Sequence, residues 1–314
     1  ERLSVLVNGA TTVEFSPQRG LRQGDSLSPF LFNIAAEGLS ILMSRALNLG
    51  IIKGVKIGSG GVDLTHLQFA DDSLILCEAN VREVRNLKKI LRCFEMLSGL
   101  KINYHKSIVS GVCVPEEEML EFASVLNCKV RTLPFQYLGL PLGANPSRKA
   151  TWRPVLDKFR SKLTGWKWKL LSFAGRLMLI KAVLSSLPIY YLSLYNLPQG
   201  GARALEKMQA SFLWGGAELK RKVHLVKWKE VAKPVEQGGL GVRRVKVVND
   251  CLLLKWKWRF GVENKALWRR VICSKYRLDE GSWSPPASPI SRLSKIWNDL
   301  LSGSDQSGSM LDFF

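Results

Sequence analysis

A pair of neighbouring aspartates between two short apolar runs restricts the local structure of this chain more than any other feature. The runs at 67–69 and 74–76 flank the tetrapeptide Ala70-Asp71-Asp72-Ser73. Short apolar runs on both sides of a turn predict a β-hairpin, here with both carboxylates at its tip. Two like charges so close repel each other, whereas a hard cation such as Mg²⁺ binds several oxygen ligands. The alternative is that Asp-Asp is only a common turn pair.

The rest of the first half alternates short strands with helices. Turn signals and hydrophobic periodicity predict a hairpin over 4–15 around Asn8-Gly9, a loop over 16–29, a largely buried helix over 30–47, an amphipathic helix over 81–97 ended by Gly99, a strand within 101–114 and a strand over 135–142. This order is typical of an α+β domain, in which one antiparallel sheet is covered by helices on one face.

The composition changes near 145–150, where Asn, Pro, Ser, Arg and Lys follow one another. We therefore predict a first domain over 1–145, a mainly helical region over 146–260 and a loosely ordered extension over 261–314. The expected helices of the second region lie at about 151–170, 172–187, 200–214 and 247–260.

Positive charge is concentrated in the second half of the chain. The 46 Lys and Arg side chains exceed the 26 Asp and Glu by 20, and residues 151–314 carry 17 of that surplus. Such a one-sided excess favours a polyanionic partner, nucleic acid first, over a surface whose cations are merely solvated. The segment 177–197 is the most apolar stretch, but Lys181 and Pro188 interrupt it, so we expect no membrane partner.

The six cysteines contain no Cys-x-x-Cys pair, and the three histidines do not cluster with them. We therefore expect no zinc site and no disulfide framework, and reduced thiols indicate an intracellular protein, nuclear or cytoplasmic.

Four ordered segments of the chain resemble the conserved boxes of reverse transcriptases from non-LTR (LINE-type) retrotransposons, especially those of plants. These segments are RQGDSLSPFLFN at 22–33, FADD at 69–72, SGLKINYHKS at 98–107 and FQYLGLPLG at 135–143. Ser26 replaces the proline usual in the first box. The segments FLWGG at 212–216 and GGLGV at 238–242 resemble the region that follows the polymerase in plant elements, so the resemblance covers nearly the whole chain.

This resemblance implies a partial polymerase palm followed by a helical thumb, and the activity of an RNA-directed DNA polymerase, a nucleotidyltransferase. It implies an RNA template, a DNA primer, deoxynucleoside triphosphates and Mg²⁺, with Mn²⁺ as a substitute. The implied catalytic residues are Asp71, Asp72 and Lys106, of which the two aspartates hold the metal and the lysine protonates the pyrophosphate leaving group. The implied nucleotide or template contacts are Gln23, Gly24, Ser28 and Phe69. The implied primer grip is a hairpin formed by Tyr137, Leu138 and Gly139.

One catalytic residue of the family has no counterpart in this sequence. The family's first catalytic aspartate lies on a strand upstream of the QG box, and neither Glu1 nor Glu14 has its flanking residues. A two-metal site needs ligands from both strands, so we expect this polypeptide to be a truncated fragment that is inactive alone. A noncatalytic nucleic-acid-binding relic, and a helical interaction protein with an accidental acidic turn, are the alternatives.

Tryptophans alternate with cations at two places in the second half. These places are 166–169 and 255–259, and all ten tryptophans lie from Trp152 onwards. Aromatic rings stack on bases while cations contact phosphates, which favours nucleic-acid binding. The alternative, which we prefer for individual tryptophans, is that they pack in a helical core.

Overall fold

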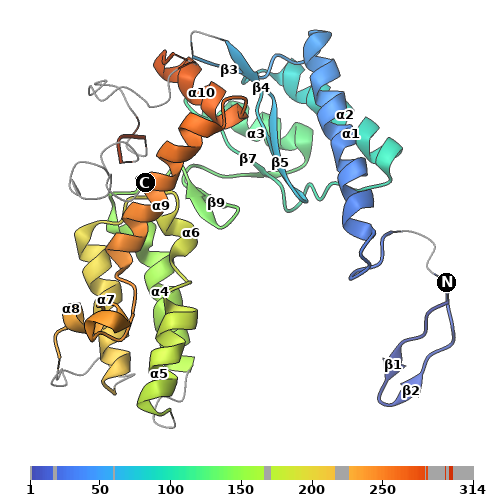
Figure 1. Ribbon diagram of the computed structural model, residues 1–314. Helices are drawn as coiled ribbons and strands as arrows, with labels where there is room; N and C mark the ends of the chain where they lie inside the picture. The colour runs from blue at the N-terminus through green and yellow to red at the C-terminus, as the bar shows by residue number, and fades with distance from the viewer. Residues whose placement is uncertain are drawn as a thin grey trace. The chain divides into compact units, whose positions relative to one another are not determined.

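The computed structural model describes residues 2–16, 20–58, 61–165, 171–215 and 226–279, together with 281, 294 and 297–299 (Figure 1). These residues form mixed α and β structure that is mostly helical. The chain divides into two compact units. The first contains Glu1–Lys56 and Asp63–Thr132, and the second contains Ile57–Val62 and Leu133–Phe314. The domain boundaries expected at 145 and 260 stay predictions. The limits of a compact structural unit need not coincide with those of an evolutionary domain.

The N-terminal hairpin forms around Asn8-Gly9, as predicted. Strand β1 (Leu6–Val7) pairs antiparallel with β2 (Ala10–Thr11). Asn8 and Gly9 both have positive φ, at 50° and 84°. A two-residue hairpin turn of the primed type I class needs positive φ at both positions, which Asn and Gly tolerate best.

Helix α1 (Ser28–Asn48) begins with Ser28 and Pro29, as expected. Its apolar residues are not largely buried, so that part of the prediction is wrong. Phe30, Ile34 and Ile41 are 67%, 71% and 60% exposed, because α1 packs mainly along one side, through Leu39 and its neighbours, against α2. By length and composition alone, α1 is the one helix among the described residues that could cross a membrane.

Helix α2 (Val81–Ser98) has the start and end that its sequence predicts. The Asn80 side chain accepts a hydrogen bond from the backbone N–H of Arg82, which caps the first turn. Gly99 ends the helix with φ of 71°. Leu87, Leu91 and Phe94 of α2 form the core of the first unit with apolar residues of α1.

Helix α3 (Glu116–Leu126) was not expected from the sequence. Pro115 precedes three glutamates that occupy its first turn, where the helix dipole favours negative charge. Met119 and Phe122 pack against Val84 of α2. The acidic run after a proline is the signal that could have identified this helix.

The described strands form five two-stranded ladders and not the single antiparallel sheet that was expected. They are two to four residues long, and each pairs with one other strand. Strand β7 (Ile108–Val109) pairs in parallel with β8 (Lys129–Val130).

Strands β3 (Val55–Ile57) and β4 (Val62–Leu64) also pair, and the end of their hairpin belongs to the second unit. There the Ser274 hydroxyl donates a hydrogen bond to the Ile57 carbonyl at 2.7 Å. A Cβ at Gly58 would collide with the backbone of Ser274, so this close approach requires glycine.

The second unit is mainly helical. Its elements are β9 (Phe135–Tyr137), β10 (Leu140–Leu142), α4 (Lys149–Gly165), α5 (Phe173–Leu179), a π-helical turn (Ile180–Leu184), α6 (Ile189–Leu192), α7 (Gln199–Leu213), α8 (Trp228–Val231), a 3₁₀ turn (Val235–Gln237), α9 (Val245–Val262) and α10 (Leu267–Tyr276).

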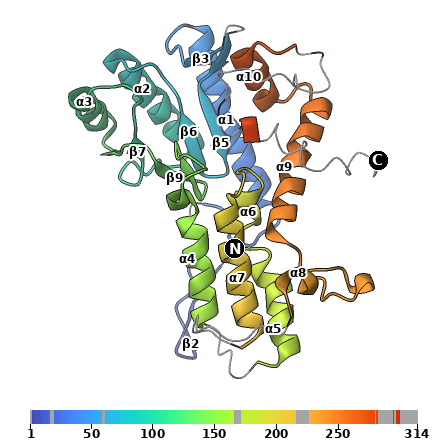
Figure 2. The same cartoon turned by 90° about the vertical axis from the view of Figure 1, so that its left-hand side faces the viewer.

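Helix α7 packs against both α4 and α9, and the core between them contains Phe159, Leu205 and Phe212 (Figure 2). The expected helices are confirmed over their described parts. Helix α10 lies within the segment that was expected to be loosely ordered, so the structure adds a regular helix there.

Candidate functional site

The acidic pair lies at the tip of a tight hairpin, as its sequence predicts. Strands β5 (His66–Phe69) and β6 (Asp72–Ile75) are antiparallel, with Phe69 opposite Asp72. The loop therefore consists of Ala70 and Asp71 alone, and Ala70 adopts a positive φ of 50°. Asp71 occupies the turn, whereas Asp72 is already the first residue of a strand.

The two faces of this hairpin differ in burial. His66 and Ile75 face each other on one side, where Ile75 packs against the core of the first unit. There the His66 ring shares hydrogen bonds with Thr65 at 2.9 Å and Ser40 at 3.0 Å, and burial lowers the pKa of His66. Side chains alternate across a strand, so Phe69 and Asp72 lie on the other side, where Phe69 is 66% exposed. The hairpin thus presents an aromatic ring and a carboxylate on an open face.

The chemistry of this tip fits a hard divalent cation only in part. Asp71 and Asp72 are exposed carboxylates, and neither forms an ion pair with another described residue. Carboxylate oxygen is the ligand type that Mg²⁺ and Mn²⁺ prefer. The described residues contain no group of three or more His, Cys, Asp or Glu side chains that could hold a metal ion. At this tip the described residues offer two carboxylates, which is fewer than a metal site of three or more such ligands needs.

The loop that carries Gln23 and Gly24 is closed by its own hydrogen bonds. The Ser28 hydroxyl donates to the Arg22 carbonyl at 2.8 Å, and an Asp25 carboxylate oxygen accepts from the Leu27 N–H at 2.9 Å. Gly24 has φ of 87°, and no atom lies within 4 Å of the Cβ position there. Ser28 therefore shapes the loop, and one side of the Gly24 backbone is open.

Lys106 lies on a turn that, like the loop of Gln23 and Gly24, is closed by short-range hydrogen bonds of its own residues. Its backbone N–H donates to the Asn103 side chain at 3.1 Å, and the Ser107 hydroxyl donates to the Asn103 carbonyl at 2.9 Å. The Lys106 side chain is exposed and forms no ion pair with a described residue. Its turn belongs to the first unit, as do Gln23, Gly24 and the acidic hairpin. The structure shows no hydrogen bond from Gln23, Gly24 or the Lys106 side chain to Asp71 or Asp72.

The residues Tyr137, Leu138 and Gly139 lie in the second unit, on the β9–β10 hairpin. The expectation of one strand over 135–142 is wrong, because Leu138 and Gly139 form a two-residue turn and Tyr137 pairs with Leu140. The Tyr190 and Tyr191 hydroxyls donate to the carbonyls of Leu138 and Gly139. Sequence reasoning missed both tyrosines, since they follow the turn by more than fifty residues and carry no local motif.

A hollow of about 360 Å³ in the second unit is lined by two cations and no acidic residue. The Lys181 side chain comes from the π-helical turn and Arg243 from the segment before α9. Neither forms an ion pair with another described residue. Apolar side chains such as Ile189 and Val245 complete the lining. A negatively charged group in the hollow would be paired by the two cations, which offsets the cost of its burial.

The described tryptophans of the alternating segments have mixed surroundings. The Trp256 ring packs edge-on against Trp268 at 5.2 Å, and its indole N–H donates to the Ser193 carbonyl. The Arg259 guanidinium lies 4.5 Å from the centre of the Trp256 ring, whereas Trp258 is 59% exposed. Trp256 is thus partly buried against a core cluster of the second unit, while Trp258 remains accessible. The segment 166–169 lies outside the described residues.

Comparison with known proteins gives a family match over the N-terminal part of the chain. Residues 2–142 match the family described as reverse transcriptase (RNA-dependent DNA polymerase). A putative ribonuclease H protein of Arabidopsis thaliana, At1g65750, is 40% identical over 164 residues, which are 52% of this chain and 26% of that protein.

Two retrotransposon proteins are also similar. The Pol polyprotein from the type-1 retrotransposable element R2 of Popillia japonica is 34% identical over 153 residues, 46% of this chain and 20% of the polyprotein. That from the type-2 element R2DM of Drosophila melanogaster is 26% identical over 317 residues, 96% of this chain and 29% of the polyprotein. The chain spans about a quarter of the length of these relatives. It therefore carries a reverse transcriptase domain over residues 2–142 and has homologues among the proteins of non-LTR retrotransposons.

Proposed function

We propose that this chain is part of an RNA-directed DNA polymerase of a non-LTR retrotransposon, which adds deoxynucleotides to a DNA primer on an RNA template. The observation that carries the proposal is that the matched family region contains the hairpin with Asp71 and Asp72 at its tip. The open face of this hairpin, with the exposed Phe69 ring beside Asp72, leaves room for a nucleic-acid terminus.

Each site residue has a role that its surroundings allow. Asp71, with Asp72, would hold Mg²⁺ or Mn²⁺, which when bound stabilises charge on the transferring phosphoryl group. The exposed Lys106 would protonate the departing pyrophosphate or stabilise its charge. The open backbone at Gly24, beside Gln23, allows a nucleotide to approach closely.

The polypeptide of residues 1–314 would not complete this chemistry alone. A two-metal site needs carboxylates that converge from more than one strand, and the described residues provide only the pair at 71–72. We propose that an upstream segment of a longer protein supplies the missing aspartate, and that 1–314 by itself does not polymerise.

Primer extension tests this proposal. The chain joined to an upstream reverse transcriptase segment should extend a DNA primer on RNA only with Mg²⁺ or Mn²⁺, and Asp71→Asn should abolish the extension. Asp63→Asn, which changes an exposed aspartate of β4 in the same unit, is the matched control and should retain activity. Full activity of Asp71→Asn would refute the assignment of Asp71.

The basic second half supports a second candidate function, noncatalytic binding of nucleic acid. Residues 151–314 carry a surplus of 17 positive charges, and the hollow with Lys181 and Arg243 contains no acidic side chain. Each phosphate contact contributes about one unit to the slope of log K against log salt concentration. Lys181→Met and Arg243→Met should each reduce that slope by about 1 for an RNA–DNA hybrid.

Lys158→Met is the matched control, because Lys158 is an exposed lysine of α4 outside the hollow. Affinity that does not depend on salt would contradict binding through phosphates. Salt-dependent binding by 1–314, without metal-dependent extension even after the upstream segment is joined, would favour the binding function over the polymerase.

A further inference from the structure

The turn between β9 and β10 has an unfavourable backbone conformation at Leu138. Leu138 and Gly139 both have positive φ, at 49° and 77°. Glycine and asparagine tolerate this conformation, whereas the Cβ of a leucine crowds the following carbonyl oxygen. Residues held in this way persist only where the surrounding structure fixes them, and they concentrate at functional sites.

Two tyrosine hydroxyls fix this turn. The strand ladder ends with Tyr137 opposite Leu140, so the carbonyls of the two loop residues have no partner in the ladder. The Tyr190 hydroxyl donates to the Leu138 carbonyl at 2.8 Å, and the Tyr191 hydroxyl donates to the Gly139 carbonyl at 3.2 Å. The two carbonyls that the turn leaves unpaired are thus each bound by one of two adjacent residues of α6.

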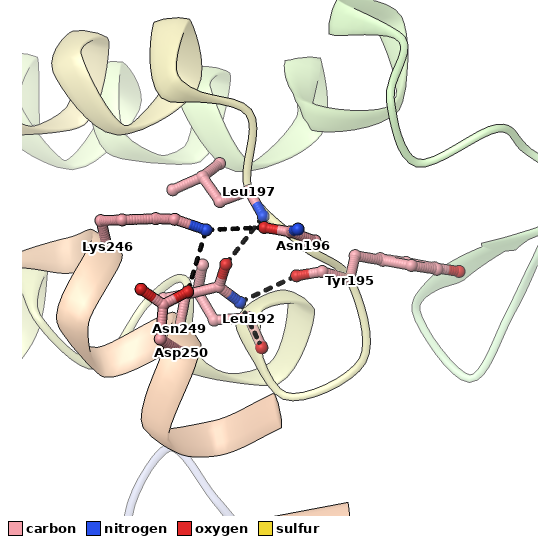
Figure 3. A network of polar contacts seen from close by, with 7 residues as sticks. All are labelled: Leu192, Tyr195, Asn196, Leu197, Lys246, Asn249 and Asp250. Carbon is pink, nitrogen blue, oxygen red and sulfur yellow. Dashed lines mark hydrogen bonds and ion pairs between the residues drawn. The ribbon is translucent and has the colours of Figure 1, made fainter. Parts of the chain in front are cut away.

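Helix α6 is itself held by α9 (Figure 3). The fully buried Asn249 of α9 donates to the carbonyls of Leu192 and Tyr195 and accepts a hydrogen bond from the N–H of Leu197. The Trp256 indole also donates to the Ser193 carbonyl, at 2.6 Å. Because α6 has only four residues, Ile189–Leu192, these bonds at its C-terminal end determine where its tyrosines lie.

Packing keeps the Tyr191 hydroxyl available as a donor. The Tyr191, Trp152 and Tyr195 rings form a mutual cluster, in which the Tyr191 ring centre lies 5.9 Å from that of Trp152 and 6.1 Å from that of Tyr195. Burial, with a smaller contribution from Tyr190, raises the pKa of Tyr191, so its hydroxyl remains a donor even at a pH where an exposed tyrosine begins to lose its proton.

We infer that Tyr190 and Tyr191 are positioning residues that hold the Leu138–Gly139 turn in the conformation in which it supports the primer terminus, and that Asn249 fixes these tyrosines. The inference rests on the proposed function, because the role of the turn at the primer end is part of that proposal. Neither tyrosine is assigned a contact with the reacting atoms.

The test combines hydrogen exchange with binding, on the 314-residue chain. The double variant Tyr190→Phe/Tyr191→Phe removes only the two hydroxyls, and Tyr195→Phe is the matched control because Tyr195 makes no hydrogen bond to the turn through its hydroxyl. We expect amide exchange in the segment 135–142 to become about tenfold faster in the double variant, with unchanged exchange in α2. We also expect the wild-type chain to prefer an RNA–DNA hybrid with a recessed primer 3′ end over a blunt hybrid, and the double variant to lose that preference.

Each outcome has a distinct meaning. Unchanged exchange in 135–142 would overturn the positioning role of the tyrosines. Faster exchange with an intact preference for the recessed end would also overturn it, because the turn would then not need to be held. A wild-type chain without any such preference would overturn the proposed primer role of the turn, whatever the exchange shows.

Discussion

Replacement of Asn249 by leucine should destabilise the second unit strongly, because one side chain satisfies three buried backbone groups. The Asn249 amide binds the Leu192 and Tyr195 carbonyls at 2.7 and 2.9 Å, and its oxygen accepts from the Leu197 N–H at 2.8 Å. Leucine has the same number of side-chain heavy atoms, branched at the same position, and cannot form any of these bonds. The substitution therefore leaves polar groups without partners and creates little cavity.

The expected size of the effect follows from these three bonds. A typical intramolecular hydrogen bond contributes about 0.5–1.5 kcal/mol net, and a buried group left without a partner costs about 1–3 kcal/mol. Partial relaxation of the α6–α7 segment would recover some of this cost. We therefore expect a loss of about 3 kcal/mol in the free energy of unfolding, with about 2–5 kcal/mol as the plausible range.

Urea unfolding followed by tryptophan fluorescence measures this loss in the relevant part of the chain. All ten tryptophans lie from Trp152 onwards, so their emission reports the second unit and not the first. With a slope of about 2 kcal/mol per molar urea, the midpoint should fall by about 1.5 M.

The matched control is Asp250→Asn on the same helix. The Asp250 carboxylate is partly exposed and pairs with Lys246 at 2.9 Å, so its loss should cost at most about 1 kcal/mol. If Asn249→Leu costs no more than this control, the reasoning from buried hydrogen bonds is refuted.

Three further predictions concern the first unit and are read by far-UV circular dichroism or by chemical labelling. Gly99→Ala should destabilise it by about 1 kcal/mol, because φ of 71° disfavours a Cβ although no atom lies within 4 Å of that position. Gly38→Ala in α1 of the same unit, at a glycine without positive φ whose Cβ would meet only Phe94 at 4.0 Å, should not destabilise. Leu39→Ala should lower the free energy of unfolding by about 2–4 kcal/mol, because Leu39 is buried in the core of the first unit. Ile34→Ser, on the exposed side of α1, should lower it by less than about 0.5 kcal/mol, and equal losses would contradict the packing of α1. Burial, and to a smaller extent the charges of Glu83 and Glu78, raises the pKa of the Cys77 thiol to about 11. Iodoacetamide should therefore label Cys77 more slowly than the exposed Cys93 at pH 8 to 9. Because the folded thiol keeps its proton above the ordinary pKa, the free energy of unfolding should also fall as pH rises from 9 towards 11.

Features with short-range causes could be predicted from the sequence. The Asn8-Gly9 turn, the hairpin around Asp71 and Asp72, and α2 between Asn80 and Gly99 all depend on residues within a few positions of each other. The acidic pair and its hairpin followed from this local pattern, and the family resemblance followed from motif order.

Features that depend on distant partners could not be predicted. The exposure of Ile34 depends on which elements pack against α1. The apolar sequence of the helix alone does not determine which of its sides is covered. The side of the hairpin on which Asp72 lies follows from the packing of Ile75 on the first core. The hydroxyls that hold the Leu138–Gly139 turn come from residues 52 positions away, where no motif points back to the turn.

The end of the β3–β4 hairpin gives the chain an unusual connectivity. Since residues 57–62 belong to the second unit and their flanks to the first, the polypeptide passes between the units after Lys56, after Val62 and again after Thr132. A protease that cuts once near 132 would therefore leave residues 57–62, which belong to the second unit, covalently attached to the first. Complete covalent separation of the units requires cuts at all three passages, and a continuous segment that contains either unit whole also contains part of the other.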